Sequence, residues 1–515
     1  MRNGMLVALL TAGVVGLTSA AASAATHQVG PSRTIKTLQG LPQLNPGDVI
    51  ELDGDASYPA YSASRAGAAG NPITLRGVRV AGKRPVISGG ANNTLAIEAD
   101  HWVVEGVEIT GGAARCFYHH ADDVVLRDSY VHDCPKQGIL GADSDSGSLL
   151  LEYVEVARAG GGTQDHQIYM ATDDTRFPNA VFRMQFCWVH DGNGGNGVKS
   201  RAARNEIYYN WIEGSLYHEL ELIGADGQPE ALVREDSDVV GNVLMKGGGH
   251  SSFYAVRAGG DGTGQSNGRF RFAYNTFIMA ADSSGVFRLF DGIQSLQADN
   301  NVIWRVGGGA QVVVREVEAS WVGGSTLITG ANNWILTAGT GVPTGFTGSV
   351  RGANPMLVDV AGNDLRPATG SPLINAAAAT TTAPAGAAIP NPLPLPLYMP
   401  SRAALAPGSA VPRPSVGAFD IGALEFGSGP PVMAPDGGVA PVVDGGRVVD
   451  SGVVLRDDAG NVIPAVDGGG VAGGGDDGGC GCQAGGKRGR LPAGAVTLGI
   501  IALLALMGSA RSRKA

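Results

Sequence analysis

Aromatic residues are scarce in this sequence: they make up 6% of its 515 residues, whereas glycine occurs 80 times. Glycine destabilises helices, and the body of the chain contains no helix-length amphipathic run. The five cysteines form no paired CxxC motif with matching histidines, so a zinc fold is not indicated. These absences favour short strands joined by tight turns over a helical or metal-stabilised fold.

A basic surface is also absent, because the formal net charge is −10. The two extreme ends of the chain carry seven basic residues, and the segment 3–426 between them has a net charge of about −11. A body of that sign binds polyanions poorly in general. We therefore expect no nucleic-acid partner.

Both ends of the chain have the composition of targeting segments. Residues 1–25 combine Arg2, an apolar run and the small-residue site Ala22-Ser23-Ala24, which predicts an export signal peptide rather than a membrane anchor. Residues 427–486 are rich in Gly, Asp and Pro and predict a disordered linker that carries a Cys480–Cys482 motif near its end. Residues 487–515 contain an apolar run of marginal length for a transmembrane helix, followed by basic residues.

The cysteine motif, hydrophobic helix and basic end together resemble the MYXO-CTERM sorting tail of myxobacteria. The resemblance implies an exported protein at the cell surface or outer envelope, held in the membrane through the tail or released after processing. A simple C-terminal anchor is the alternative. Either interpretation places the body outside the cytoplasm, where we expect a monomer.

The body contains an internal repeat. Its copies read GVEI, SYVH, YVEV, CWVH, NWIE, NVLM, NTFI and NVIW, starting at Gly106, Ser129, Tyr153, Cys187, Asn210, Asn242, Asn275 and Asn301. A period of about 23 residues with variable insertions is typical of a solenoid. In the last four copies asparagine occupies the same place, where stacked amides can form a hydrogen-bonded ladder.

This ladder resembles the internal asparagine ladder of right-handed parallel β-helices, the fold of pectate lyases and related carbohydrate-active proteins. The resemblance implies an all-β fold, a right-handed parallel β-helix solenoid over residues 26–426. Two passages, at 353–376 and 416–426, resemble the closing segment of bacterial β-helix proteins. The Ala- and Pro-rich stretch 376–415 between them predicts a long loop.

Candidate functional residues fall on strands that follow one another at the repeat distance. These strands are HQIYMAT from His166, GVKSRA from Gly197, HELELIG from His218, FYAVRAG from Phe253 and VFRLFDG from Val286. Because alternate residues of a strand face opposite sides, buried Val198 and Leu220 imply an exposed outer row. The residues expected in that row are Lys199, Arg201, Glu219 and Glu221, with Arg257 and Arg288 as further candidates.

Polysaccharide lyases of the resembled fold remove the proton beside a uronate carboxyl group, which needs a base and a cation. Lys199 would be the base, and the neighbouring Arg201 and Arg204 would favour its neutral form. Arg201 would bind the substrate carboxylate as a planar fork. His166, Tyr169 or His218 would donate a proton to the leaving oxygen.

Other interpretations of this group stay open. Glu219 and Glu221 would lie about one coil from Lys199 and could hold it in a solvated salt-bridge ladder. Two carboxylates also suit a glycoside hydrolase, and an epimerase is a further enzyme option. The rival from another class is a non-catalytic adhesin that binds an extracellular polysaccharide through the same groove.

Calcium is the one cofactor that the sequence suggests. Asp165, Asp173 and Asp174 flank one strand and are candidate ligands, although they lack the spacing of a calcium loop. Val-His-Asp occurs twice, at 131–133 and 189–191, which indicates a structural turn. Cys116 and Cys134 lie about one coil apart, where either a disulfide or two stacked thiols would fit.

Overall fold

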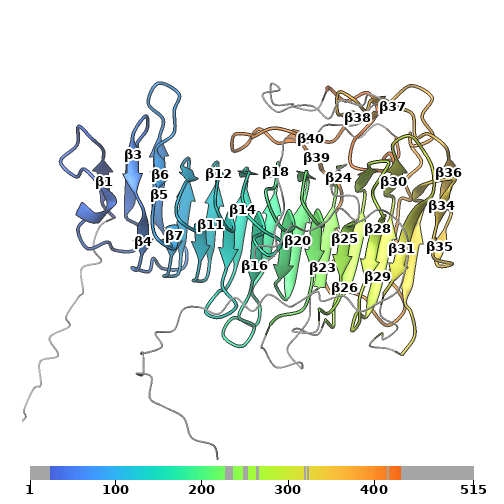
Figure 1. Ribbon diagram of the computed structural model, residues 1–515, viewed down its shortest axis with the longest axis horizontal. Helices are drawn as coiled ribbons and strands as arrows, with labels where there is room; N and C mark the ends of the chain where they lie inside the picture. The colour runs from blue at the N-terminus through green and yellow to red at the C-terminus, as the bar shows by residue number, and fades with distance from the viewer. Residues whose placement is uncertain are drawn as a thin grey trace, which may run out of the picture. The chain divides into compact units, whose positions relative to one another are not determined.

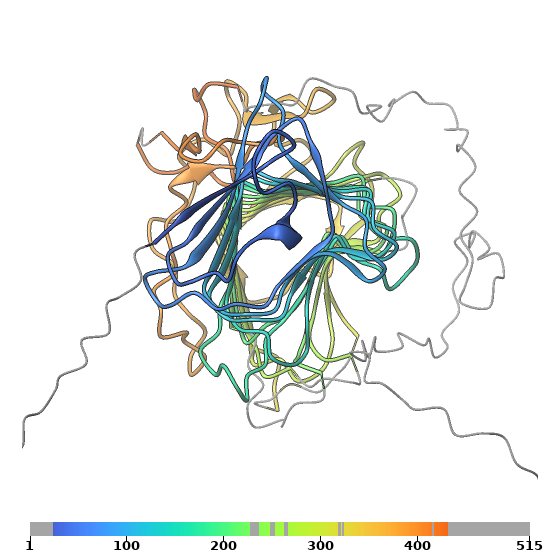
Figure 2. The ribbon, with the colours of Figure 1, turned by 90° about the vertical axis from the view of Figure 1, so that its left-hand side faces the viewer.

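The computed structural model describes residues 24–226, 236–247, 253–261, 266–317, 321, 324–414 and 417–430. The predicted sorting tail, nearly all of the predicted linker and all but the end of the predicted signal peptide lie outside these ranges. No helix in the described ranges is long and apolar enough to cross a membrane. The only helix there is a 3-10 turn, Leu38–Gly40, which covers the core at the N-terminal end (Figure 2).

Within the described ranges, three parallel sheets of 13, 12 and 11 strands form the body (Figure 1), and we call them sheets A, B and C. Sheet A contains β1 (Thr26–Val29), β2 (Val49–Asp53), β5 (Ile73–Val78), β8 (Trp102–Glu105), β11 (Val124–Arg127), β14 (Leu149–Glu152), β17 (Phe182–Gln185), β20 (Arg204–Tyr208), β23 (Asp236–Val240), β26 (Arg269–Ala273), β29 (Ser295–Asp299), β32 (Ile328–Ala331) and β35 (Phe346–Thr347). Sheet B contains β3 (Ser57–Pro59), β6 (Val86–Ser88), β9 (Glu108–Thr110), β12 (Tyr130–His132), β15 (Glu155–Ala157), β18 (Trp188–His190), β21 (Trp211–Glu213), β24 (Val243–Lys246), β27 (Thr276–Met279), β30 (Val302–Arg305), β33 (Trp334–Leu336) and β36 (Val350–Gly352). Sheet C contains β4 (Tyr61–Ala63), β7 (Asn93–Ile97), β10 (Arg115–His119), β13 (Ile139–Gly141), β16 (Ile168–Ala171), β19 (Val198–Arg201), β22 (Leu220–Leu222), β25 (Tyr254–Ala258), β28 (Gly285–Leu289), β31 (Gln311–Glu316) and β34 (Gly339–Thr340).

From β2 onward the chain visits sheets A, B and C in turn and pairs each strand with its counterpart in the next coil. This is a parallel β-helix. Parallel crossovers are right-handed in nearly all proteins, and we expect that hand here. The eight repeat motifs of the sequence all fall on sheet B, from β9 to β30, and each pairs with the next. The predicted sheet position of the repeat is therefore confirmed, but the alignment of two copies is wrong by one residue. Tyr130 pairs with Glu108 and Glu155, so Val107 and Val154 correspond to Ser129, in place of Gly106 and Tyr153.

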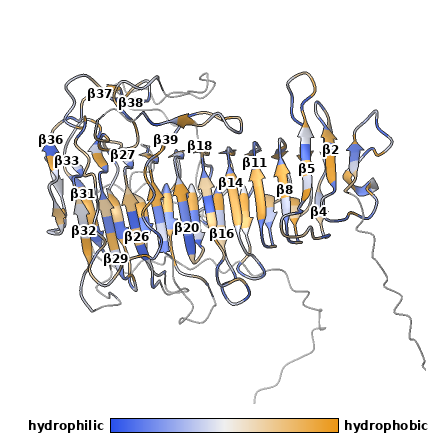
Figure 3. Ribbon diagram, turned by 180° about the vertical axis from the view of Figure 1, so that it is seen from behind, coloured by the Kyte–Doolittle hydropathy of each residue, from blue (hydrophilic) through white to orange (hydrophobic). Residues whose placement is uncertain are grey.

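Alternation along each strand fills the interior with apolar side chains, which the three sheets enclose (Figure 2). Burying one Val, Leu or Ile side chain contributes roughly 1.5–3 kcal/mol. The composition of the strands varies along sheet A (Figure 3): β8, β11 and β14 are mostly apolar and end in one charged residue each, whereas β20 and β26 carry two charged residues each. Those charges pair between coils, as in Arg271 with Asp238.

The asparagine ladder forms in the turn between sheets A and B. Each Nδ2 donates to Oδ1 of the next asparagine, at 3.0 Å from Asn210 to Asn242, 3.1 Å from Asn242 to Asn275 and 3.0 Å from Asn275 to Asn301. The ladder continues at 3.0 Å to Asn333, which the sequence alignment did not include. The predicted ladder is confirmed and is one step longer.

Replacing Asn242 with alanine is expected to lower the free energy of unfolding by roughly 3 kcal/mol, because buried groups of the coils on both sides lose their partners. Asn242 accepts from the backbone N–H of Asn210 at 2.8 Å and donates to the carbonyl of Ile207 at 2.8 Å. Urea unfolding would measure the change. The exposed Asn92→Ala is the control, with an expected effect within about 0.5 kcal/mol. Equal stability of the two variants would contradict the ladder's role.

The residue before each ladder asparagine adopts a left-handed backbone conformation, and so does the residue at the same place in earlier coils. Tyr153, Phe186 and Tyr209 have φ of 55°, 57° and 59°. A non-glycine residue in this region costs of order 1–3 kcal/mol. The three rings stack with centroids 5.0 and 5.6 Å apart, and Tyr398 packs against two of them. This aromatic stack offsets the cost of the backbone conformation.

The coils end at Gly352, and the chain then folds back over the outside of the solenoid instead of adding coils up to residue 426. This segment has two short antiparallel pairs, β37 (Leu357–Asp359) with β38 (Asp364–Pro367) and β39 (Tyr398–Met399) with β40 (Val411–Pro412). It buries an apolar cluster against sheet B, made by Trp188, Trp211, Trp334, Leu373, Met399, Ile421 and Leu424 among others. The stretch 376–415 is mostly loop, as predicted, because its prolines cannot donate to a strand ladder.

Candidate active site

The five strands that the sequence grouped are β16, β19, β22, β25 and β28, and they pair in that order in sheet C. Opposite one another along them lie Tyr169, Lys199, Glu221, Arg257 and Arg288, which we call the outer column. Their strand neighbours Val198, Leu220 and Val256 belong to the core. The predicted side for Lys199 and Glu221 is therefore confirmed.

The expected exposure of this group is wrong. Lys199 is 5% exposed, Glu221 6%, and Arg201 and Glu219 are fully buried. Glu221 contacts Lys199 and also Asn196, which precedes β19, whereas Arg201 and Glu219 contact other residues. A solvated salt-bridge ladder therefore does not describe them.

Glu221 is at the centre of the column. It accepts a hydrogen bond from Nδ2 of Asn196 and another from Arg257, whose Nη1 lies 2.6 Å from its Oε1. The Nζ of Lys199 lies 3.8 Å from its Oε2 and 5.2 Å from the centre of the Tyr169 ring. Burial opposes charge on this carboxyl, but the cations Lys199 and Arg257 hold the pKa of Glu221 below its usual range. Of the three partners of Glu221, Lys199 lies farthest from its carboxylate oxygens.

Arg201 is not placed to bind a substrate carboxylate. Its Nη1 donates to the carbonyl of Gly224 at 2.6 Å, and its Nη2 forms an ion pair with Asp261. Arg204, expected to act on Lys199, lies on sheet A, where it pairs with Asp238 and Glu206. In the outer column the cation beyond Glu221 is Arg257, whose buried Nε has no hydrogen-bond partner within the described part of the chain.

His166 and His218 lie at the edge of the outer column as neutral rings. Burial lowers the pKa of both His166 and His218 to about 3. His166 accepts a hydrogen bond at Nδ1 from the backbone N–H of Asn196, at 2.9 Å, so its proton is on Nε2. His218 donates from Nδ1 to the carbonyl of Tyr254 at 2.7 Å. A neutral imidazole is a poor acid, which leaves Tyr169 as the better proton donor of the three predicted candidates.

Glu219 does not share the space of Glu221, contrary to the sequence prediction. Its carboxylate accepts a hydrogen bond from Ser215 Oγ at 2.5 Å and lies 3.6 Å from Nζ of Lys246 on sheet B. Burial raises the pKa of Glu219 to about 7 and lowers that of Lys246. The two carboxylates thus belong to separate buried groups, each with its own lysine partner.

The predicted calcium ligands do not converge. Asp173 accepts backbone N–H groups of Asp145, Thr175 and Arg176, and Asp174 accepts from the hydroxyl of Thr172. Nowhere in the described ranges do three or more His, Cys, Asp or Glu side chains come together in a way that could hold a metal ion. The side chains of Asp165, Asp173 and Asp174 therefore do not fit a calcium site.

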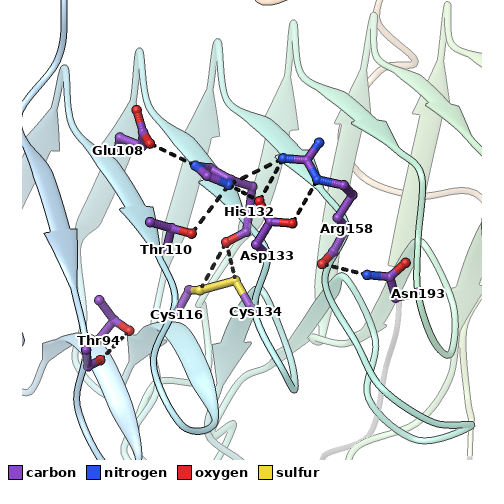
Figure 4. Close-up of a disulfide and its surroundings, with 10 residues drawn as sticks. Thr94, Glu108, Thr110, Cys116, His132, Asp133, Cys134, Arg158 and Asn193 are labelled. Atoms are coloured by element: carbon purple, nitrogen blue, oxygen red, sulfur yellow. Dashed lines mark hydrogen bonds and ion pairs between the residues drawn. A yellow bond between two sulfur atoms is a disulfide. The ribbon is translucent and has the colours of Figure 1, made fainter. Parts of the chain in front are cut away.

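The repeated Val-His-Asp motif forms a structural turn, as expected (Figure 4). His132 contacts Asp133 at Nδ1, 2.5 Å away, and Glu108 at Nε2, 3.0 Å away, and Asp133 also binds Arg158. His190 makes the equivalent contacts with Asp191 and Glu155. Next to the first turn, Cys116 and Cys134 form a disulfide, so the alternative of stacked thiols is wrong.

Four polar residues of the site were missed or given another role at the sequence level. Asn196 contacts Glu221, Asp261 contacts Arg201, and Lys246 contacts Glu219. Asp143 accepts a hydrogen bond from Tyr169 Oη at 3.3 Å, and burial raises the pKa of Asp143 to about 6. Asn196 stands one coil before Glu221, a spacing that the repeat could have revealed. Nothing in the sequence singles out Asp261.

No protein-family profile and no curated protein matches the chain. Among solved structures it is similar to an alginate lyase from Paenibacillus sp. str. FPU-7, with 16% identity and a TM-score of 0.39 over 64% of this chain and 99% of that one. It is also similar to pectate lyase Pel9A, with 13% identity and a TM-score of 0.40 over 79% and 98%. A third similar structure is the A-module of a mannuronan C-5 epimerase from Azotobacter vinelandii, with 13% identity and a TM-score of 0.36 over 59% of this chain and 91% of that one. These likenesses are too distant to bear on activity. The strand pairing itself defines the class: the chain is a parallel β-helix protein.

Proposed function

We propose that the protein is an exported polysaccharide lyase that cleaves a uronate-containing polysaccharide by β-elimination. The observation that carries the proposal is the outer column, in which Tyr169, Lys199, Glu221 and Arg257 lie opposite one another on neighbouring strands. It places an amine, a phenol and a guanidinium side by side, and these are the groups that this elimination requires.

In the proposed step Lys199 first loses its ammonium proton to solvent, and its amine then takes the proton from the carbon beside the uronate carboxyl group. The electron pair of that C–H bond forms a carbon–carbon double bond, and the glycosidic C–O bond breaks. The leaving oxygen takes the phenol proton of Tyr169. Arg257 neutralises the carboxylate as charge develops on it, and Glu221 holds Arg257 and Lys199 in position.

The test is a screen of the full chain against pectate, alginate and glycosaminoglycans, with and without added Ca²⁺. A lyase product carries a double bond conjugated to its carboxyl group and absorbs in the ultraviolet. An epimerase would change the polymer without releasing this absorbance. Absence of the absorbance on every polymer would refute the lyase assignment.

A non-catalytic glycan-binding protein of the cell surface is the second candidate. The burial of Lys199 and Glu221 favours it, because a static buried ion group needs no catalytic role. Binding to one of the polymers without any product would support this alternative. The export signal, the sorting tail, the surface location and the monomeric state belong to the proposal for either function.

A further inference from the structure

The outer column continues past Glu221 as a row of arginines. Arg257 on β25, Arg288 on β28 and Arg315 on β31 lie opposite one another in successive coils. Neighbouring strands are about 4.8 Å apart, so the row offers one guanidinium per coil. Exposure rises along it: Arg257 is buried, Arg288 is half-buried and Arg315 is exposed.

An aromatic ring supports the first two arginines. The guanidinium groups of Arg257 and Arg288 lie 4.1 and 4.8 Å from the centre of the Phe290 ring. A guanidinium that stacks on a ring keeps its N–H groups in a fixed plane, which suits a planar carboxylate. Like charges on directly opposite residues of neighbouring strands destabilise a sheet. Glu221 already forms an ion pair with Arg257, so an anionic ligand would act mainly where Arg288 and Arg315 lie opposite each other.

The column has a different character on the other side of Lys199. Tyr169, Leu140 and Tyr118 lie opposite one another on β16, β13 and β10, and none carries a charge at neutral pH. Lys199 and Glu221 therefore stand where an uncharged half of the column meets a cationic half. Tyr169 is fully buried, so Tyr118 is the partly exposed ring of the uncharged half, and Arg288 and Arg315 are the accessible guanidinium groups of the cationic half.

We infer that Arg257, Arg288 and Arg315 bind carboxylates on successive units of a polyuronate chain, on the C-terminal side of Lys199. The inference rests on the proposed function for the class of polymer. The inference adds a binding site for the polymer. It also says on which side of Lys199 the bound acidic units lie, namely over β25, β28 and β31. Because the body as a whole is acidic, this local row is what selects a polyanion.

The test measures binding of the full chain to polygalacturonate and alginate, with neutral dextran as the comparison, by affinity gel electrophoresis. The variant is Arg288→Gln with Arg315→Gln. The control is Arg65→Gln, which removes one positive charge, against two in the double variant, from an exposed turn between sheets C and A. The double variant is expected to bind the better polyuronate roughly tenfold more weakly, with a smaller dependence on salt, and the control to bind as the native protein does.

Each outcome separates this inference from the lyase proposal. If the native protein cleaves a polyuronate and the double variant keeps the same KM, the arginine row is not the binding site while the lyase assignment stands. If the native protein binds but never cleaves, and the double variant loses binding, the row is confirmed and the lyase assignment fails. A native protein that binds neither polyuronate overturns the arginine row, and the lyase assignment is then decided by the glycosaminoglycans of the activity screen.

Discussion

Replacing Lys199 with methionine is expected to reduce turnover of a uronate polymer by roughly 10²–10⁴-fold, the usual effect of removing a general base. Methionine has a similar length and no titratable group. Glu221 keeps Asn196 and Arg257 as partners, so the fold is expected to survive. The measurement is the initial rate of ultraviolet absorbance on the polymer that the native protein cleaves, with circular dichroism as the check on folding.

Two further variants separate chemistry from structure. Tyr169→Phe removes the phenol proton without a change in charge and is expected to lower turnover while KM changes little, because Tyr169 acts on the leaving oxygen. Lys136→Met makes the same substitution as Lys199→Met at an exposed position and is expected to leave turnover unchanged. A Lys199→Met protein that retains native activity would remove Lys199 from the mechanism.

The sequence predicted the fold well because one structural rule repeats in every coil. The motifs from Gly106 to Asn301 all fall on sheet B, and the asparagine places are hydrogen-bonded from coil to coil. The return of residues 353–430 over sheet B was not foreseen. That segment packs through scattered apolar residues such as Leu373 and Met399, which have no period to detect.

The site was predicted in part, and the limit is physical. Alternation of sides holds only within a strand, and β22 begins at Leu220. Glu219 precedes that strand, so its side chain turns toward Ser215 and Lys246 instead of joining Glu221. Burial was also missed, because it depends on contacts such as Arg201 with Asp261, 60 residues apart, that no local pattern encodes.

Replacing Glu219 with alanine is expected to destabilise the fold by about 3–5 kcal/mol, the usual effect of leaving one partner of a buried ion pair alone. Both side chains are fully buried, and the Nζ of Lys246 would lose the carboxylate of Glu219 while keeping its hydrogen bond to the carbonyl of Ser215, at 2.9 Å. The midpoint of urea unfolding would report the loss. The exposed Glu98→Ala is the control, with an expected change within about 0.5 kcal/mol.

The double variant Glu219→Gln with Lys246→Met distinguishes charge from packing at this position. It removes both charges with little change in volume, and replacing a buried pair in this way is often neutral or stabilising by roughly 1–4 kcal/mol. The double variant is therefore expected to be more stable than Glu219→Ala by several kcal/mol. If it is as unstable as Glu219→Ala, the loss comes from shape and from the contact with Ser215. If Glu219→Ala itself unfolds like the native protein, Lys246 does not depend on Glu219 for its charge. Since β22 and β24 each pair with strands of the neighbouring coils, a loss here would also loosen the coil that carries Glu221, and turnover would fall together with stability.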